Sequence, residues 1–236
     1  TNIFLILGIA AIIGKKVNVT YELIHVDLPM LIGSSFLLTL TIWDGVFTLP
    51  EALLCISGVF LYLVYTLSIE KKHKDTEIKK EMKGFLKKRK KLDWKALIVL
   101  VVSVFFIYIG ANYTVESVIN LSEALSIGKE IIAVSAVALG TSLPELMVTV
   151  SAARKGKPEM AVGNILGSNI FNSFAVMGIP ALIGTLVIPS SILTFGLPMM
   201  LAATLLYFFI TQDREITQWE GWMLVIFYVF FIGKVF

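Results

Sequence analysis

Long apolar segments, separated by short polar ones, make up most of this chain of 236 residues. The run from Met160 to Gln212 contains no charged residue, and it is long enough for two helical membrane crossings of about 20 residues each. Apolar and polar positions do not alternate within these runs, so helices are expected and the strands of a membrane barrel are not. The predicted spans are residues 1–13, 28–43, 46–69, 95–119, 126–153, 160–184, 190–211 and 216–236.

The composition and the distribution of charge support this interpretation. Hydrophobic residues make up 57% of the chain and charged residues 16%, whereas about a quarter of a soluble domain is charged. Eleven of the 20 lysines and arginines lie between Lys71 and Lys91, and the positive-inside rule places this loop, 70–94, in the cytoplasm. Counting spans outward from the loop places the other basic clusters, Lys15–Lys16, Arg154–Lys157 and Arg214, on the same side. We therefore predict a multi-pass integral protein of the cell membrane.

The chain resembles itself when it is shifted by 170 residues. Asn2–Gly14 aligns with Asn172–Gly184, and the two segments share the first Asn and several glycines. After an adjustment of one residue, Leu28, Pro29, Met30, Asp44, Thr48 and Glu51 align with Leu197, Pro198, Met199, Asp213, Thr217 and Glu220. The span after Asn2 runs toward the predicted cytoplasmic side, and the span after Asn172 runs away from it. The two repeats are therefore predicted to be inverted, as in many transporters.

This repeat predicts the domain organisation. We expect an all-α integral membrane protein, an inverted-repeat transporter of ten helices, of which the chain holds about seven complete spans and one truncated N-terminal span. Residues 1–69 are then the remainder of the first repeat, with three spans. Residues 70–94 are the basic loop, and 95–236 are the complete second repeat with five spans. The missing N-terminal half-repeat of the same protein is the expected structural partner.

An acid interrupts the apolar span 126–153 near its middle. Ionisable groups at this depth are costly and usually mark an ion or proton site, so Glu145 is the first candidate ligand. Thr141 precedes Glu145 by four residues, and Ser168 precedes Asn172 by four, so each pair shares one helical face. All these ligands are hard oxygens without His or Cys, a set that suits Na⁺ or Ca²⁺. A simpler alternative is that the hydroxyls bond back to their own helices.

Backbone oxygen is also expected near the candidate acid. Pro144 cannot donate a hydrogen bond to the carbonyl of Gly140, so this carbonyl is free where side-chain oxygens already gather. Ca²⁺ takes about 6 to 8 oxygens and normally more than one carboxylate. The missing half-repeat is therefore expected to contain a second acid.

Two polar motifs carry a resemblance to a known family. Ala138-Leu-Gly-Thr-Ser-Leu-Pro-Glu-Leu146 and Gly163-Asn-Ile-Leu-Gly-Ser-Asn-Ile-Phe-Asn172 resemble the second α-repeat of the sodium/calcium exchanger family, within the cation/calcium antiporter superfamily. This resemblance implies that kinked helices from both halves meet at the membrane centre and bind Na⁺ and Ca²⁺ alternately. The ligands that it implies are Glu145 as the central carboxylate, with Thr141, Ser142, Ser168, Asn172, Asn2 and Ala138.

The expected function is exchange of Na⁺ for Ca²⁺ by secondary active antiport, without a cofactor other than the transported ions. H⁺/Ca²⁺ antiport is the main alternative, although Asn172 is an amide where some relatives carry an acid, which favours Na⁺. A cation channel is a remote alternative, because inverted repeats favour alternating access over a continuous pore. No intramembrane His accompanies Ser142 or Ser168, so an enzyme is not expected.

The lipid bilayer is the expected partner of the spans, and no nucleic acid is expected to bind. The segment 71–91 has apolar residues at helical spacing among lysines, which indicates contact with anionic lipids. A solvated linker that obeys the positive-inside rule is an equally good interpretation of the same segment.

Overall fold

The computed structural model describes residues 1–20, 23–81, 94–124 and 129–235, and most of these lie in helices. The first part contains η1 (Asn2–Leu7), α1 (Gly8–Gly14), β1 (Lys16–Asn18), η2 (Leu23–Asp27), α2 (Leu28–Ile42), β2 (Val46–Phe47) and α3 (Leu49–Glu81), where η marks a π-helical turn. The second part contains α4 (Trp94–Ala124), α5 (Lys129–Arg154), α6 (Pro158–Phe171), η3 (Asn172–Val176), α7 (Met177–Ala181), β3 (Leu186–Val187), η4 (Ile192–Gly196), α8 (Leu197–Ile210), β4 (Glu215–Thr217) and α9 (Gln218–Val235).

The element order repeats, as the self-alignment predicts. The series η1–α1–β1–η2–α2–β2–α3 recurs as η3–α7–β3–η4–α8–β4–α9. The π-helical turns η2 and η4 directly precede α2 and α8, each with a proline, Pro29 or Pro198, in its first turn. Proline has no N–H for the regular helical ladder, so a wider turn at this point accommodates the interruption.

The packing of the two repeats is equivalent too. A Cβ added to Gly8 of α1 would lie 3.0 Å from the carbonyl oxygen of Gly221 in α9. A Cβ added to the equivalent Gly178 of α7 would lie 3.3 Å from the carbonyl oxygen of Ala52 in α3. Small residues permit helices to approach this closely. The short helix of each repeat therefore packs on the long last helix of the other.

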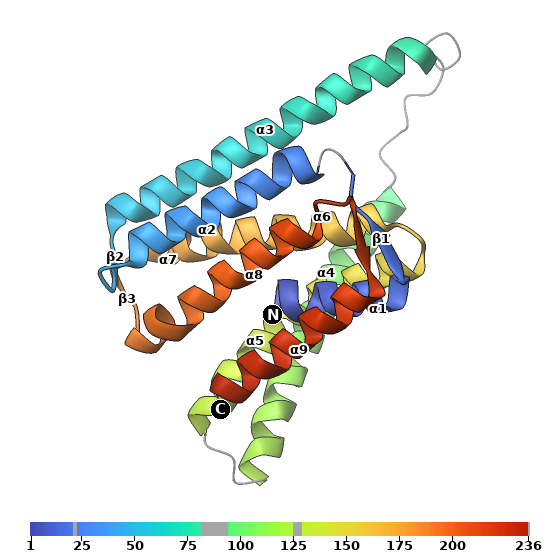
Figure 1. Cartoon of the computed structure of the whole chain (residues 1–236). Coiled ribbons are helices and arrows are strands. Elements are labelled where there is room, and N and C mark those ends of the chain that lie inside the picture. The colour runs from blue at the N-terminus through green and yellow to red at the C-terminus, as the bar shows by residue number, and fades with distance from the viewer. Residues whose placement is uncertain (21–22, 82–93, 125–128, 236) are drawn as a thin grey trace.

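Two antiparallel sheets join the repeats at opposite ends of the molecule (Figure 1). β1 pairs with β4, where Val17 lies opposite Ile216, and β2 pairs with β3, where Phe47 lies opposite Leu186. The helices α1 and α7, which precede β1 and β3, therefore run toward opposite ends, which is the predicted inversion. The described part of the chain is mostly helical, as the predicted all-α class requires, and these four short strands are the exception. The chain must leave its helices at each end, and pairing between repeats satisfies the backbone groups of buried Val17, Phe47 and Ile216.

The last helix of each repeat begins with the same capping box. The Thr48 N–H and hydroxyl donate to Glu51 Oε2, at 2.6 and 2.8 Å. The Thr217 N–H and hydroxyl donate to Glu220 Oε2, at 2.6 and 2.9 Å. A threonine at the N-cap and a glutamate three residues later satisfy the free donors of a helix start. This explains why the self-alignment matches these polar residues.

Four helices in the described part of the chain are long and apolar enough to cross a membrane, judged by length and composition. They are Leu23–Ile42, Leu49–Ser68, Met160–Ala181 and Ile192–Ile210. The other predicted spans correspond to η1 with α1, α4, α5 and α9, and the total number of crossings stays a prediction.

Two predicted boundaries are wrong. The span predicted at 28–43 belongs to a helix that starts at Leu23, because η2 extends it toward the N-terminus. The span predicted at 46–69 starts at Leu49, after β2, and continues to Glu81 within the predicted loop. Residues 70–81 contain neither Gly nor Pro and are rich in Lys and Glu, which are good helix formers, so the helix outlasts its apolar part. The rest of the predicted loop, 82–93, and the side chains proposed to contact lipid lie outside the described part.

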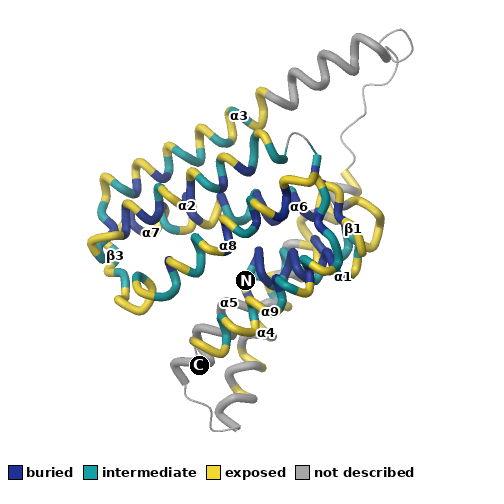
Figure 2. Tube along the Cα trace, viewed as in Figure 1, coloured by how far each residue is buried: buried dark blue, intermediate teal, exposed yellow. Residues whose placement is uncertain are grey.

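The distribution of buried residues is the one expected of a helical bundle in a membrane. Buried positions face the middle of the bundle, and exposed positions lie on its outer helix faces (Figure 2). In α3, Ala52 and Cys55 are fully buried, whereas Phe60 and Leu61 are 64% and 62% exposed. Large apolar side chains pointing away from the protein are what a bilayer would cover.

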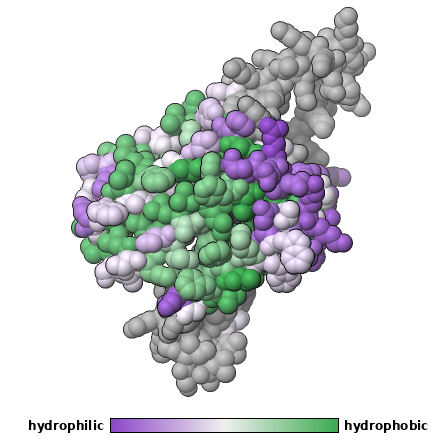
Figure 3. All heavy atoms as spheres, viewed as in Figure 1, coloured by the Kyte–Doolittle hydropathy of each residue, from purple (hydrophilic) through white to green (hydrophobic). Residues whose placement is uncertain are grey.

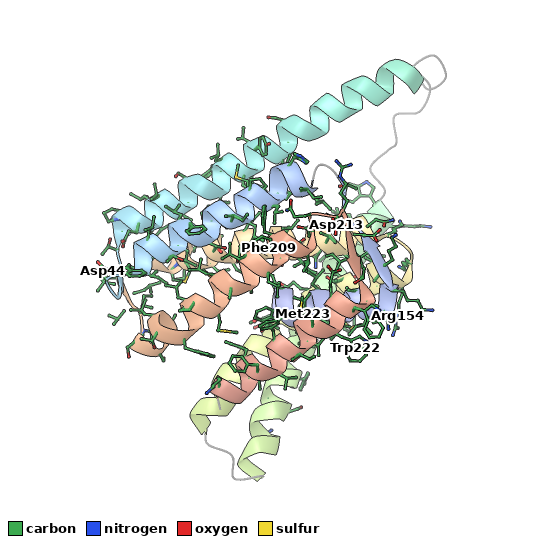
Figure 4. All side chains as sticks on the ribbon, viewed as in Figure 1. Asp44, Arg154, Phe209, Asp213, Trp222 and Met223 are labelled. Carbon is green, nitrogen blue, oxygen red and sulfur yellow. The ribbon has the colours of Figure 1, made fainter. Side chains whose placement is uncertain are left out.

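Polar residues concentrate at the ends of the bundle. Figure 3 shows hydrophilic residues gathered around β1 and the start of α6, beside a largely hydrophobic surface. Arg154 and Asp213 lie at this end, and Asp44 lies at the opposite end (Figure 4). Lys16 of β1 forms an ion pair with Glu215 of β4 at the same end. We call this the basic end, because it holds the clusters Lys15–Lys16, Arg154–Lys157 and Arg214.

Candidate functional site

A cavity with one polar wall lies beside the hairpin formed by α5 and α6, and its volume is about 450 Å³. Its polar wall consists of Glu145 from α5, with Asn164, Ser168 and Asn172 from α6 and the start of η3. The last three residues are four apart along a continuous helix, so they lie along one face. The remaining lining residues are small or apolar: Pro144, Val148, Gly163, Gly167 and Phe171. The two motifs found in the sequence therefore meet at one cavity.

The Glu145 carboxylate is the charged group of this cavity. Its Oε2 atom is buried and has no hydrogen-bond donor within the described part of the chain. A buried carboxylate oxygen without a donor is costly, so it favours the binding of a cation. Among the described residues, no group of three or more His, Cys, Asp or Glu side chains gathers around a possible metal site. The cavity therefore offers one acid and several neutral oxygens.

Asn2 joins the first repeat to this site. Its Nδ2 donates to Ser168 Oγ at 3.1 Å, although the two residues are 166 positions apart. The Ser168 hydroxyl itself donates to the Ile165 carbonyl at 3.1 Å. A hydroxyl has one donor and two lone pairs, so after these two bonds Ser168 keeps one lone pair for a ligand. This contact places Asn2, one of the ligands that the resemblance implies, beside Ser168, and its role in ion binding stays a prediction.

The structure adds Asn164 to the predicted residues. Its Nδ2 donates to the Glu145 carbonyl at 3.3 Å and to the Thr149 hydroxyl at 3.0 Å. Thr149 is fully buried, so this amide clamps α5 to α6 directly beside the carboxylate. Sequence reasoning missed this role. The available signal was the spacing, because Asn164 precedes Ser168 by four residues, as Ser168 precedes Asn172.

A second cavity of about 260 Å³ shares Asn172 with the first. It is lined in part by Asn2, Asn169, Ser35 and Thr204. The hydroxyls of Ser35 and Thr204 are 3.3 Å apart and occupy equivalent positions in the two repeats, where α2 contacts α8. Asn172 therefore separates the Glu145 cavity from a polar space between the repeats.

The structure does not gather every predicted ligand. Thr141 and Ser142 lie on α5, on the turn before Glu145, and they are not among the described residues that line the Glu145 cavity. Ala138 also lies on α5, but its side chain is outside the described part. Thr141 is exposed and Ser142 is half-buried. Pro144 lies inside α5, between these residues and the carboxylate, as the sequence suggests. Glu145, Ser168, Asn172 and Asn2 are the predicted residues that the fold brings together.

Inverted repeats of apolar helices, with polar side chains gathered at one cavity, are the architecture of a secondary transporter. The comparison with known families agrees. The family described as sodium/calcium exchanger protein matches residues 95–236, more than half of the chain. The chain belongs to this family, which consists of ion exchangers and not of enzymes.

Individual exchangers and antiporters match the chain over different lengths. Sodium/calcium exchanger MaX1 of Methanosarcina acetivorans is 46% identical over 143 residues, which are 60% of this chain and 41% of the relative. Putative antiporter CaxA of Alkalimonas amylolytica is 29% identical over 234 residues, which are 97% of this chain and 73% of the relative. A solved structure of the sodium-calcium exchanger NCX_Mj, soaked with Na⁺ and Sr²⁺, matches with a TM-score of 0.78 at 24% identity. That match covers 99% of this chain and 72% of the solved chain, and it shows a shared fold.

Proposed function

We propose that the protein is a secondary active cation antiporter that exchanges Na⁺ for Ca²⁺ at the Glu145 cavity. The observation that carries the proposal is the Glu145 carboxylate. Its Oε2 atom is buried without a hydrogen-bond donor in the described part of the chain, and Glu145 is the one charged residue among the described residues that line the cavity. The names of the relatives, a sodium/calcium exchanger and a putative antiporter, support the same class of function.

The proposed ligands differ in what they offer each ion. Na⁺ is satisfied by neutral oxygens, such as the Ser168 hydroxyl and the Asn172 carbonyl, whereas Ca²⁺ depends on carboxylates. Thr141, Ser142 and the backbone at Ala138 are proposed to complete the coordination from the preceding turns of α5. Ca²⁺ normally takes more than one carboxylate. The proposal therefore requires a second acid next to the cavity.

Exchange follows if both ions use Glu145. Each ion must then leave before the other binds, and the site must open to one side of the membrane at a time. Inverted repeats permit this, because two equivalent arrangements open toward opposite sides. We propose that the basic end faces the cytoplasm of a cell membrane, together with loop 70–94, in accordance with the positive-inside rule.

The deciding experiment measures Ca²⁺ uptake into membrane vesicles that contain the protein. An outward Na⁺ gradient and an outward H⁺ gradient are imposed separately, each with and without K⁺. We expect uptake to follow the Na⁺ gradient. Uptake that follows only the H⁺ gradient would replace Na⁺ by H⁺ as the coupling ion, and uptake driven by membrane potential alone would indicate a channel.

Glu145→Gln tests the site itself. The amide keeps the size of the side chain but removes its charge, so Ca²⁺ uptake should fall to the level of empty vesicles while the protein still inserts and folds. Glu215→Gln is the matched control, because it removes the same charge from an ion pair at the basic end, away from the cavity. Near-normal exchange by Glu145→Gln would refute the proposed site.

A further inference from the structure

One polar contact breaks the equivalence of the two repeats. The Tyr62 hydroxyl of α3 donates to Asp27 Oδ1 at 3.0 Å, at the junction of η2 and α2. The equivalent positions in the second repeat are Gly196 and Phe231, neither of which carries a polar side chain. There Phe231 instead stacks on Phe195 of η4, with ring centroids 5.8 Å apart. The same two elements are therefore held by a hydrogen bond in one repeat and by an aromatic stack in the other.

The position of Asp27 makes this difference significant. Asp27 lies within the apolar helix Leu23–Ile42, where a carboxylate is costly and usually has a function. It lies near the start of that helix, in the half of the molecule nearest the basic end, and α2 and α3 run side by side there (Figure 1). A hydrogen bond to a charged group is about twice as strong as one between neutral groups. This hydrogen bond therefore holds η2 to α3 in the first repeat, and the second repeat has the aromatic stack at the equivalent place.

The helix that carries the site packs directly against this pair. A Cβ added to Gly167 of α6 would lie 4.0 Å from the Tyr62 hydroxyl oxygen. A Cβ added to Gly163, one turn earlier, would lie 3.7 Å from Leu23 Cδ2 of η2. Both glycines also line the Glu145 cavity, and Gly167 precedes the candidate ligand Ser168. Tyr62 and η2 thus form the wall behind the glycine face of α6.

We propose that Asp27 and Tyr62 are positioning residues that hold α6, and with it Ser168, at the opening of the site toward the basic end. This inference rests on the proposed exchange of ions at the Glu145 cavity. The two openings of an inverted repeat are built from equivalent elements. The hydrogen bond between Tyr62 and Asp27 exists in only one repeat, so it acts on only one of the two openings. Its loss is expected to change the affinity of the site for ions that enter from that face of the membrane.

Tyr62→Phe is the direct test, because it gives the first repeat the residue that the second repeat has. Tyr207→Phe is the matched control: the Tyr207 hydroxyl is fully buried and has no hydrogen-bond partner in the described part of the chain. Removal of an unpartnered hydroxyl costs little, whereas removal of the Tyr62 donor leaves the Asp27 carboxylate unsatisfied. The two variants lose the same atom from the same residue type.

The first measurement is hydrogen–deuterium exchange of the α6 segment 163–168, which does not depend on transport. We expect Tyr62→Phe to raise its exchange rate about tenfold, as the loss of a charge-assisted bond implies, and Tyr207→Phe to leave it unchanged. No change in Tyr62→Phe, or an equal change in Tyr207→Phe, would overturn the positioning role.

The second measurement is the Ca²⁺ concentration for half-maximal exchange, determined separately at each face in vesicles of known orientation. We expect Tyr62→Phe to shift it several-fold at the face of the basic end and not at the other. Equal shifts at both faces would indicate general loss of structure and would overturn the inference. Absence of any transport by the unmodified protein would refute the proposed function, and the exchange rate of α6 would still decide the positioning role.

Discussion

Gly221→Ala is a sensitive test of the packing between the repeats. The added Cβ would lie 2.8 Å from the carbonyl oxygen of Gly8 and 2.9 Å from the Cβ of Ala11. Carbon atoms in good contact are about 3.5 to 4.0 Å apart, so α1 and α9 would have to separate. The nearest atom belongs to the backbone, and rotation of a side chain cannot remove the clash.

The expected magnitude follows from two opposing effects. Overpacking in a close interface costs about 1 to 3 kcal/mol, and a backbone clash belongs to the upper part of this range. Alanine returns about 1 kcal/mol through its higher helix propensity. The net loss of about 1 to 2 kcal/mol corresponds to a melting temperature about 2 to 8 °C lower for a chain of this size. Exchange activity should fall as well, because α9 also contacts η1, which carries Asn2 to the site.

The assay is thermal unfolding of purified protein in detergent, followed by tryptophan fluorescence. Gly233→Ala is the control on the same helix, because no atom lies within 4 Å of a Cβ at Gly233. It gains helix propensity without a clash, so its melting temperature should equal or slightly exceed that of the unmodified protein. A Gly221→Ala protein as stable as Gly233→Ala would refute the close packing of α1 on α9.

Three further predictions concern the site and its frame. Asn164→Leu should raise the Ca²⁺ concentration for half-maximal exchange about tenfold or more, because the bonds from Asn164 to α5 beside Glu145 are lost; an unchanged requirement would contradict the clamp. Ser168→Ala should raise the half-saturating Na⁺ concentration more than that of Ca²⁺ in the vesicle assay, since neutral oxygens serve Na⁺; equal shifts would indicate a packing defect. Thr48→Ala and Thr217→Ala should each cost about 1 kcal/mol in thermal unfolding, because their capping boxes are equivalent; a clear difference between the two would contradict the equivalence of the repeats.

Much of the architecture could be predicted because it depends on local composition. Apolar runs of membrane length form helices whatever surrounds them, since the backbone must bond within itself in lipid. The capping threonines and glutamates act within one helical turn, so their alignment at Thr48 and Thr217 reported a real repeat. The predicted span 46–69 was wrong at both ends, since α3 runs from Leu49 to Glu81, because hydropathy detects the lipid-facing part of a helix and not the helix itself.

Part of the candidate site could also be predicted from the sequence, and part could not. Glu145, Ser168 and Asn172 could be identified from their chemistry and four-residue spacing, because an acid and hydroxyls in an apolar helix are unusual in any fold. The four-residue spacing places Asn164 on the same helical face as Ser168, but it could not show that Asn164 clamps α5 to α6. Its hydrogen bonds cross between helices, and which amide faces which carbonyl depends on the rotation of both helices.

The sequence by itself therefore determined the class of protein, its internal repeat and the polar residues proposed to bind its ions, because these follow from hydropathy, periodicity and side-chain type. The tertiary structure alone decided which of these residues meet. It placed Asn2 3.1 Å from Ser168, left the Glu145 Oε2 atom buried without a donor, and set Tyr62 against Asp27 in one repeat only. The physical reason is that such contacts join residues far apart in the chain, and close packing between helices, not local propensity, sets their distances.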